Sequence, residues 1–171
     1  MRIGAFLIGF LTFIGLGIVF STAYTIDEGE RGVILRNGSI SGVAEPGFHL
    51  KTPFIESVAK ISTRSGTRAY GDTLAYSRDQ QTAALHVTVS YRLPVDRVEE
   101  IYAEYGSEEG VLTRLLDRQV NEKIRIVFGQ FNAVTSIQDR GRLSAELSTA
   151  IINAVDGPII IEWVQIGRAH V

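Results

Sequence analysis

Residues 82–92 read TAALHVTVSYR, and this stretch decides the kind of fold that the chain adopts. Hydrophobic residues stand at every second position from Leu85 to Tyr91, with small or polar residues between them. A period of two is typical of a β-strand with one buried face. After Pro94 the apolar residues are three or four positions apart, as on one face of a helix: Val98, Ile101, Tyr102 and Tyr105. The chain therefore changes from strands to helices near Pro94.

The residues before 82 contain several further strands. Residues 31–36 (RGVILR) form a strand that ends at the strong turn signal Asn37-Gly38. A short strand follows over 48–51, and a third follows with Val58 and Ile61 as core residues. The stretch around 78–81 (RDQQ) then connects a longer strand to residues 82–92.

The residues after Pro94 predict about three helices and a final strand. The first helix begins near Asp96, which forms a capping box with Glu99, and the second covers 107–128. The third opens at Ser136 as its N-cap. The last strand carries three residues on one face: Ile159, Ile161 and Trp163. Strands followed by helices predict the α+β class, with an antiparallel-rich sheet packed against the helices.

The amino-terminal segment predicts a membrane anchor over residues 3–25, because no charged residue lies between Ile3 and Ile26. About 20 apolar residues suffice to cross the hydrocarbon core of a bilayer. A buried soluble helix is disfavoured because the segment is apolar on every side. The residues expected to contact lipid are Ile3, Phe6, Leu7, Phe10, Leu11, Phe13, Ile14, Leu16, Ile18, Val19 and Phe20.

A cleaved signal peptide remains the alternative, with Arg2 as a minimal basic region and Ser21 and Ala23 at cleavage spacing. The apolar run is longer than the usual signal core of about 7–15 residues, which favours the anchor. Arg2 precedes the segment and acidic residues follow it, so the positive-inside rule places the body on the exported (periplasmic) side of a single-pass protein.

The composition of the chain excludes several classes of functional site. The chain has 171 residues, a net charge of −2 and no cysteine, which excludes disulfides, thiolate metal sites and a cysteine nucleophile. Its three histidines, His49, His86 and His170, are far apart in sequence and form no metal motif. No nucleotide-binding or hydrolase motif is present, and the basic residues lack the aromatic pattern of nucleic-acid binding. We therefore expect no catalytic, cofactor or metal site and no nucleic-acid partner.

Three stretches of this sequence resemble the SPFH (band 7) superfamily of stomatins, prohibitins, flotillins and the HflC and HflK proteins. They are 25–38 (TIDEGERGVILRNG), 45–62 (EPGFHLKTPFIESVAKIS) and 77–94 (SRDQQTAALHVTVSYRLP). The resemblance covers residues 26–166 and looks closest to bacterial or phage prohibitin-like proteins. The positions that match family motifs are Glu30, Gly32, Val33, Arg36, Gly38, Pro46, Gly47, His49, Pro53, Phe54, Asp79, Tyr91 and Arg92.

Two positions stand out from the family pattern. The family's usual Asp-Gly-Gln reads Asp79-Gln80-Gln81 here, so the turn lacks its glycine. Gly141 lies inside the expected third helix, where glycine costs about 1 kcal/mol relative to alanine, and predicts a bend or close packing there.

The resemblance implies a non-enzymatic scaffold that forms homo- or hetero-oligomers with other SPFH proteins on membrane lipid. Such proteins organise membrane microdomains, and several modulate a membrane-bound AAA protease. Two other functions stay open: an exported binding domain with a cleaved signal, and a membrane-anchored hydrolase built around His49 and His86.

The last residues have a separate explanation. One set of codons for IGRAHV (166–171) spells a common short-read sequencing adapter. We therefore expect residues 167–171 to be a non-native tail, and the coiled coil that follows this domain in the family to be missing.

Overall fold

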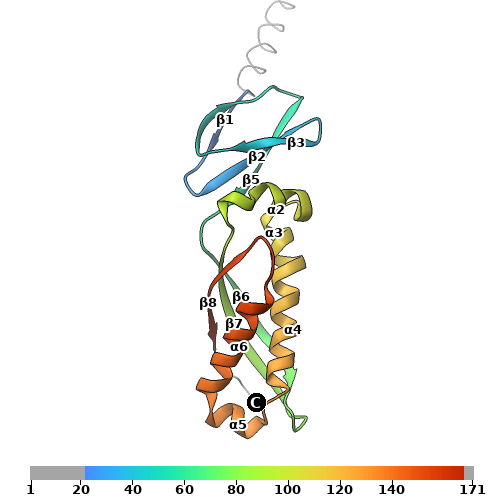
Figure 1. The fold of residues 1–171 in the computed structure, drawn as a ribbon, viewed down its shortest axis with the longest axis vertical. Helices are drawn as coiled ribbons and strands as arrows, with labels where there is room; N and C mark the ends of the chain where they lie inside the picture. The colour runs from blue at the N-terminus through green and yellow to red at the C-terminus, as the bar shows by residue number, and fades with distance from the viewer. Residues whose placement is uncertain (1–21, 168–171) are drawn as a thin grey trace, which may run out of the picture. The chain divides into compact units, whose positions relative to one another are not determined.

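The computed structural model describes residues 22–167 of the chain. These residues divide into two compact units, with the boundary between Ser62 and Thr63 (Figure 1). Residues 3–21 of the membrane segment expected over 3–25 lie outside the described residues, as do residues 168–171. Within the described range, we find no helix with the length and hydropathy needed to cross a bilayer.

Unit 1, which ends at Ser62, consists of five short strands in two antiparallel sheets. Strand β1 pairs with β4, and the second sheet has the order β3-β2-β5. The strands are β1 (Ala23–Ile26), β2 (Glu30–Arg36), β3 (Ser39–Ala44), β4 (Gly47–Leu50) and β5 (Glu56–Ser62). Their core contains Ile26, Val33 and Ile61, which are fully buried. The predicted anchor extended to residue 25, whereas Ala23–Ile26 form β1 because β4 supplies a pairing partner.

The hairpin between β2 and β3 confirms the predicted turn. Asn37 and Gly38 have φ angles of 50° and 85°, and positive φ at both positions is the geometry of a type I′ turn. Gly32 in β2 meets a different requirement, because a Cβ at this position would lie 2.5 Å from the Ile26 side chain. The family glycines therefore serve a turn in one case and close packing in the other.

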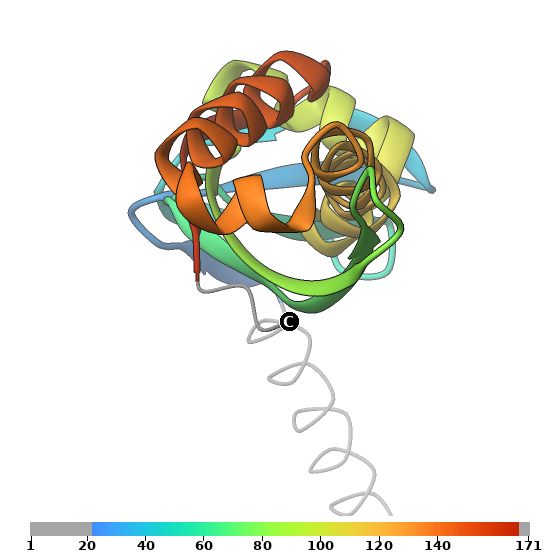
Figure 2. The ribbon, with the colours of Figure 1, turned by 90° about the horizontal axis from the view of Figure 1, so that it is seen from below.

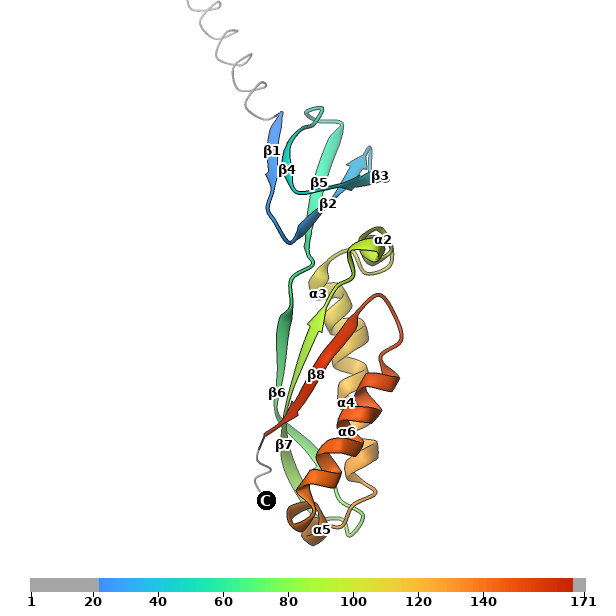
Figure 3. The same ribbon diagram turned by 60° about the vertical axis from the view of Figure 1, so that its left-hand side comes forward.

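Unit 2 contains a three-stranded antiparallel sheet of order β6-β7-β8, with helices on one side of it (Figures 2 and 3). The strands are β6 (Gly66–Tyr76), β7 (Thr82–Arg92) and β8 (Ile160–Ile166). The predicted buried face of β7 is confirmed, since Leu85, Val87, Val89 and Tyr91 are all buried. The α+β class is confirmed as well.

The helices of unit 2 follow β7. A short 3₁₀ turn η1 (Val95–Arg97) leads into α2 (Val98–Tyr105). The predicted capping box of Asp96 and Glu99 is wrong, because α2 begins without a side-chain cap. The next helical segment starts instead with Ser107, whose side chain accepts a hydrogen bond from the Gly110 amide.

The second predicted helix is present but changes its winding. It runs through α3 (Glu108–Val111), the π-helical segment η2 (Leu112–Leu116) and α4 (Asp117–Phe128). A π-helical turn inside an α-helix is rare and usually marks a local structural demand. Here Leu116 and the following Val120 and Ile124 are all fully buried, so the apolar stripe of α4 faces the sheet.

The third predicted helix is two helices in the structure, α5 (Ala133–Gln138) and α6 (Arg140–Ala154). Ser136 is not an N-cap; it lies inside α5, and its hydroxyl donates to the Ala133 carbonyl at 2.7 Å. The first amide of α5 donates to the side chain of Asp79 from the β6–β7 turn. The prediction of close packing at Gly141 is also wrong, since an added Cβ at this position would meet no atom within 4 Å. The helix break lies at Asp139 instead.

Strand β8 confirms the predicted final strand but not its faces. A register shift in the β7–β8 pairing sets Tyr91 opposite Ile161 and Ser90 opposite Trp163. Trp163 is 44% exposed, whereas Ile159 is buried. The bulge therefore turns Trp163 to the opposite side from Ile159, which a strict period of two cannot anticipate.

Candidate functional site

Unit 1 exposes an apolar patch within residues 45–62, one of the three stretches that resemble the family. Phe48 and Leu50 in β4 are each 69% exposed, and Phe54 in the following loop is 94% exposed. Ile55 beside it is 47% exposed. We call these four residues the apolar patch. Several large apolar side chains exposed close together in the sequence of a small unit are typical of an interaction site.

Phe54 also has a strained backbone. Its φ is +67°, in the left-handed region that bulky side chains rarely adopt. This conformation costs about 1–2 kcal/mol relative to ordinary backbone geometry. A strained residue with a fully exposed ring contributes nothing to folding of the described unit, which points to a contact outside it.

The loop that carries Phe54 is fixed by a polar clamp. Arg36 donates from Nη2 to Glu56 Oε1 at 2.7 Å, and Glu56 Oε2 accepts from the Thr52 amide at 2.8 Å. The Thr52 amide, followed by Arg36, lowers the pKa of the Glu56 carboxyl. The Asn37 amide also donates to the Ile55 carbonyl at 3.0 Å. Arg36 therefore serves to position the apolar patch, a role that the sequence did not indicate.

His49 is held by neighbours in unit 1. Its Nε2 lies 2.7 Å from the Glu45 carbonyl oxygen, and its ring stacks on Tyr24 with centroids 5.4 Å apart. Burial, followed by the charge of Glu56, raises the pKa of the Tyr24 phenol. These contacts join β1 to β4, so His49 has a structural explanation.

The turn between β6 and β7 is the one that lacks the family's glycine. Gln80 has a φ of +62°, so it adopts the backbone conformation that glycine would adopt without strain. Asp79 accepts hydrogen bonds from the Ser77 hydroxyl and from the Ala133 amide. The bond from Ser77, followed by the bond from Ala133, lowers the pKa of the Asp79 carboxyl. Asp79 thus connects the turn to α5.

Other motif residues have structural partners. Val33 is fully buried, and Glu30 lies 3.6 Å from Lys60. Tyr91 donates to Glu108 at 3.1 Å, and burial raises the pKa of its phenol to about 12. Arg92 pairs with Glu162 at 3.4 Å. Of the remaining positions, Pro46 and Pro53 lie in turns and loops, and Gly47 begins strand β4.

A polar cluster joins β6 to the long helix, and no sequence motif predicted it. Asp117 accepts from Arg68 Nη2 at 2.7 Å and from the Tyr70 hydroxyl at 2.8 Å. Arg68 also reaches Glu109 at 3.1 Å. Burial, followed by the bond to Asp117, raises the pKa of Tyr70, and the bond to Asp117 raises that of Arg68. We call Arg68, Tyr70, Glu109 and Asp117 the clasp.

The clasp explains why the helix is π-helical just before Asp117. The segment Leu112–Leu116 contains Leu112 and Leu116, which are both buried, and it ends where Asp117 meets β6. A wider turn lets the helix bury its leucines and still direct Asp117 to Arg68. The bonds of the clasp all lie within unit 2, so each of its four residues has a structural role.

Across the described residues, no three acidic or histidine side chains are placed to hold a metal ion. An open, mostly apolar groove of about 600 Å³ lies between α4 and α6 of unit 2. Ile126 and Ala150 lie on its two walls. The groove is open to solvent, unlike the enclosed pockets that bury most of a small ligand. The candidate functional sites are therefore exposed surfaces and not metal sites or enclosed pockets.

Comparison of the sequence with known proteins identifies the family of the chain. Residues 24–171 match the sequence profile of the SPFH domain / Band 7 family. The mitochondrial protein Prohibitin-7 of Arabidopsis thaliana is 31% identical over 143 residues, which are 82% of this chain and 50% of that protein. The Modulator of FtsH protease HflC of Escherichia coli K12 is 26% identical over 80% of this chain and 43% of its own length. Protein HflK of Vibrio cholerae is 26% identical over 85% of this chain and 35% of its own length. The chain thus spans half or less of these relatives.

Proposed function

This chain belongs to the SPFH domain / Band 7 family, and on that premise we propose that it is a membrane-anchored scaffold that forms oligomers. In this proposal, residues 3–21 anchor the protein, the body lies on the exported side, and the assembly organises membrane microdomains. The similarity to a protein named as a modulator of FtsH protease supports a further role in modulating a membrane-bound AAA protease.

The apolar patch is the observation that carries this proposal. Phe54 is 94% exposed at a strained φ of +67°, and Phe48 and Leu50 lie in the neighbouring strand. Burial of each such side chain in an apolar phase is worth about 1.5–3 kcal/mol. Insertion into the lipid interface would therefore offset the strain at Phe54.

The position of the patch in the chain supports the same partner. Strand β1 begins at Ala23, directly after the uncharged stretch, and pairs with β4 so that Ala23 lies opposite Leu50. The Lys51 amide continues this pairing by donating to the Thr22 carbonyl at 2.7 Å. A chain that leaves the bilayer at residue 22 would bring β4 to the membrane surface with it.

A cysteine scan tests the membrane contact cleanly, because the chain has no cysteine of its own. The full chain with Phe54→Cys is labelled with an environment-sensitive fluorophore and reconstituted into liposomes. We expect blue-shifted emission and quenching by spin-labelled lipid. The matched control is Ser41→Cys, an exposed position in β3, which should report water. Water-like emission at residue 54 would show that the patch does not contact lipid.

Oligomer formation is tested separately with the full chain in mild detergent. Size-exclusion chromatography with light scattering should give particles of many copies. Recovery of monomers alone, at micromolar concentration, would contradict the scaffold.

A further inference from the structure

Unit 2 presents a basic stripe on its long helix. Arg114, Arg118 and Arg125 are all exposed and lie four and seven positions apart, which places them on one side of the helix. None of them forms an ion pair within residues 22–167. Glu122, an exposed carboxylate of the same helix, lies 3.9 Å from Lys123. We call the three arginines the basic stripe.

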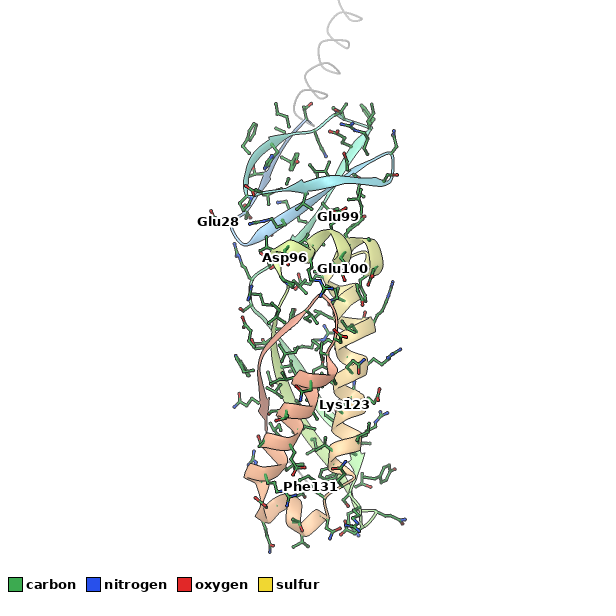
Figure 4. All side chains as sticks on the ribbon, in the orientation of Figure 1. Glu28, Asp96, Glu99, Glu100, Lys123 and Phe131 are labelled. Atoms are coloured by element: carbon green, nitrogen blue, oxygen red, sulfur yellow. The ribbon has the colours of Figure 1, made fainter. Side chains whose placement is uncertain are left out.

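The same unit presents an acidic face on a different helix. Asp96, Glu99 and Glu104 are exposed, whereas Val98 and Ile101 in the same segment are buried. None of the three carboxylates forms an ion pair in the part of the chain that the structure describes. Figure 4 shows Asp96 and Glu99 together with Glu100 at α2, and Lys123 farther along α4. We call the three free carboxylates the acidic face.

Each group contributes to a like-charge pair at helical spacing, although Glu122 lies between Arg118 and Arg125 and offsets part of the charge of the stripe. Arg114 and Arg118 are like charges at a spacing of four, and Glu104 has the same relation to Glu100. Such pairs destabilise a helix by about 0.2–0.5 kcal/mol each. Glu104 also lies in the last turn of α2, next to the negative end of the helix dipole. Opposite charges from outside the unit would relieve both costs.

We propose that the acidic face of one copy of this chain binds the basic stripe of the next copy. The inference rests on the proposed scaffold function and names the contact between its subunits. The two surfaces are comparable in extent, since Asp96 and Glu104 are eight positions apart and Arg114 and Arg125 are eleven positions apart. Each surface also carries three charges, of opposite sign.

The charges limit the symmetry of the contact. A two-fold pairing centred on the basic stripe alone would bring arginine against arginine, and one centred on the acidic face alone would bring carboxylate against carboxylate. A two-fold pair would have to set both surfaces of each copy against both surfaces of the other, whereas a head-to-tail contact uses one surface from each copy. Repetition of the head-to-tail contact gives a ring or a filament without a second type of subunit.

Charge reversal of the full chain in detergent tests this contact, with sedimentation velocity as the readout. The variant Arg114→Glu/Arg118→Glu/Arg125→Glu and the variant Asp96→Arg/Glu99→Arg/Glu104→Arg should each associate at least tenfold more weakly. A mixture of the two variants should associate again. The chain with all six changes is the matched control, since it keeps the net charge of −2 and should regain self-association.

The outcomes separate this inference from the proposed function. If the three-residue variants associate like the unchanged chain, the scaffold stands and this contact is overturned. If the six-residue variant is folded by circular dichroism but stays dissociated, complementarity is overturned too. Salt provides a second measurement that needs no variant: association of the unchanged chain should weaken between 50 and 500 mM salt, and equal affinity at both would contradict the proposal. Lipid contact at residue 54 is unaffected by any of these results.

Discussion

Gln80 holds a backbone conformation that suits glycine, with a φ of +62° in the turn between β6 and β7. We expect Gln80→Gly to raise the free energy of unfolding by about 0.5–1 kcal/mol, because relief of left-handed strain exceeds the added entropy of the unfolded chain. Urea denaturation measures the change. Gln81→Gly is the control, since the Gln81 amide donates to Ser77 Oγ at 3.0 Å and gains nothing from glycine. A loss of stability in Gln80→Gly would contradict this account of the turn.

Tyr91 gives unit 2 a specific sensitivity to alkali. Burial raises its pKa from 10.0 to about 12, so the folded state favours the neutral phenol. Both states are protonated below pH 10, and the stabilisation is complete there; between pH 10 and 12 only the unfolded state loses the proton, so stability falls. We expect Tyr91→Phe to flatten the fall of the unfolding free energy in this window by on the order of 2 kcal/mol. Tyr76→Phe, at a phenol that is 67% exposed, should leave the slope unchanged.

The clasp determines how the long helix lies on β6, and a single atom change tests it. Asp117→Asn keeps the size of the side chain but weakens its bonds to Arg68 and Tyr70. We expect a loss of about 1.5–3 kcal/mol in unfolding free energy, the usual range for a hydrogen bond to a charged group. Glu122→Gln removes an exposed charge from the same helix and should change stability by less than about 0.5 kcal/mol. Equal stability of Asp117→Asn and the unchanged chain would show that the clasp is dispensable.

At the level of elements, the sequence predicted what local pattern determines. The faces of β7, the Asn37-Gly38 turn and the extent of the helix over 107–128 all follow from spacing or turn chemistry, and all are confirmed. The start of α5 depends on Asp79, which is 54 positions from Ala133 and invisible to local reasoning. The faces of β8 depend on a bulge opposite Tyr91. Pairing between distant residues thus accounts for the differences.

For the candidate surfaces too, some features could be predicted from the sequence and others appear only in the folded chain. The family motif identified Phe54, but its exposure and its positive φ appear only in the folded chain. The helical spacing of Arg114, Arg118 and Arg125 is readable in the sequence, whereas the absence of ion partners among the described residues is not. The clasp joins residues 41 to 49 positions apart, so no motif could have indicated it.

At the level of the whole molecule, the prediction concerns retention of the apolar segment. If residues 3–21 anchor the protein, the mature chain keeps them and resists extraction from membranes by alkaline carbonate. Mass spectrometry of the mature amino terminus should give the uncleaved sequence. A chain that begins near residue 24 and is released by carbonate would support the exported domain with a cleaved signal. Deletion of 3–21 serves as the soluble reference.

The π-helical segment Leu112–Leu116 has a consequence for aligning this chain with others. A π turn holds about one residue more than an α turn of 3.6 residues, so everything after it is rotated by about 100° relative to an uninterrupted α-helix. A homologue with regular α-helix here would need one residue fewer to keep Val120 and Ile124 facing the sheet. Alignments should therefore open a single-residue gap within 112–116. Where that gap is absent, an equivalent of Asp117 would be expected in the relative.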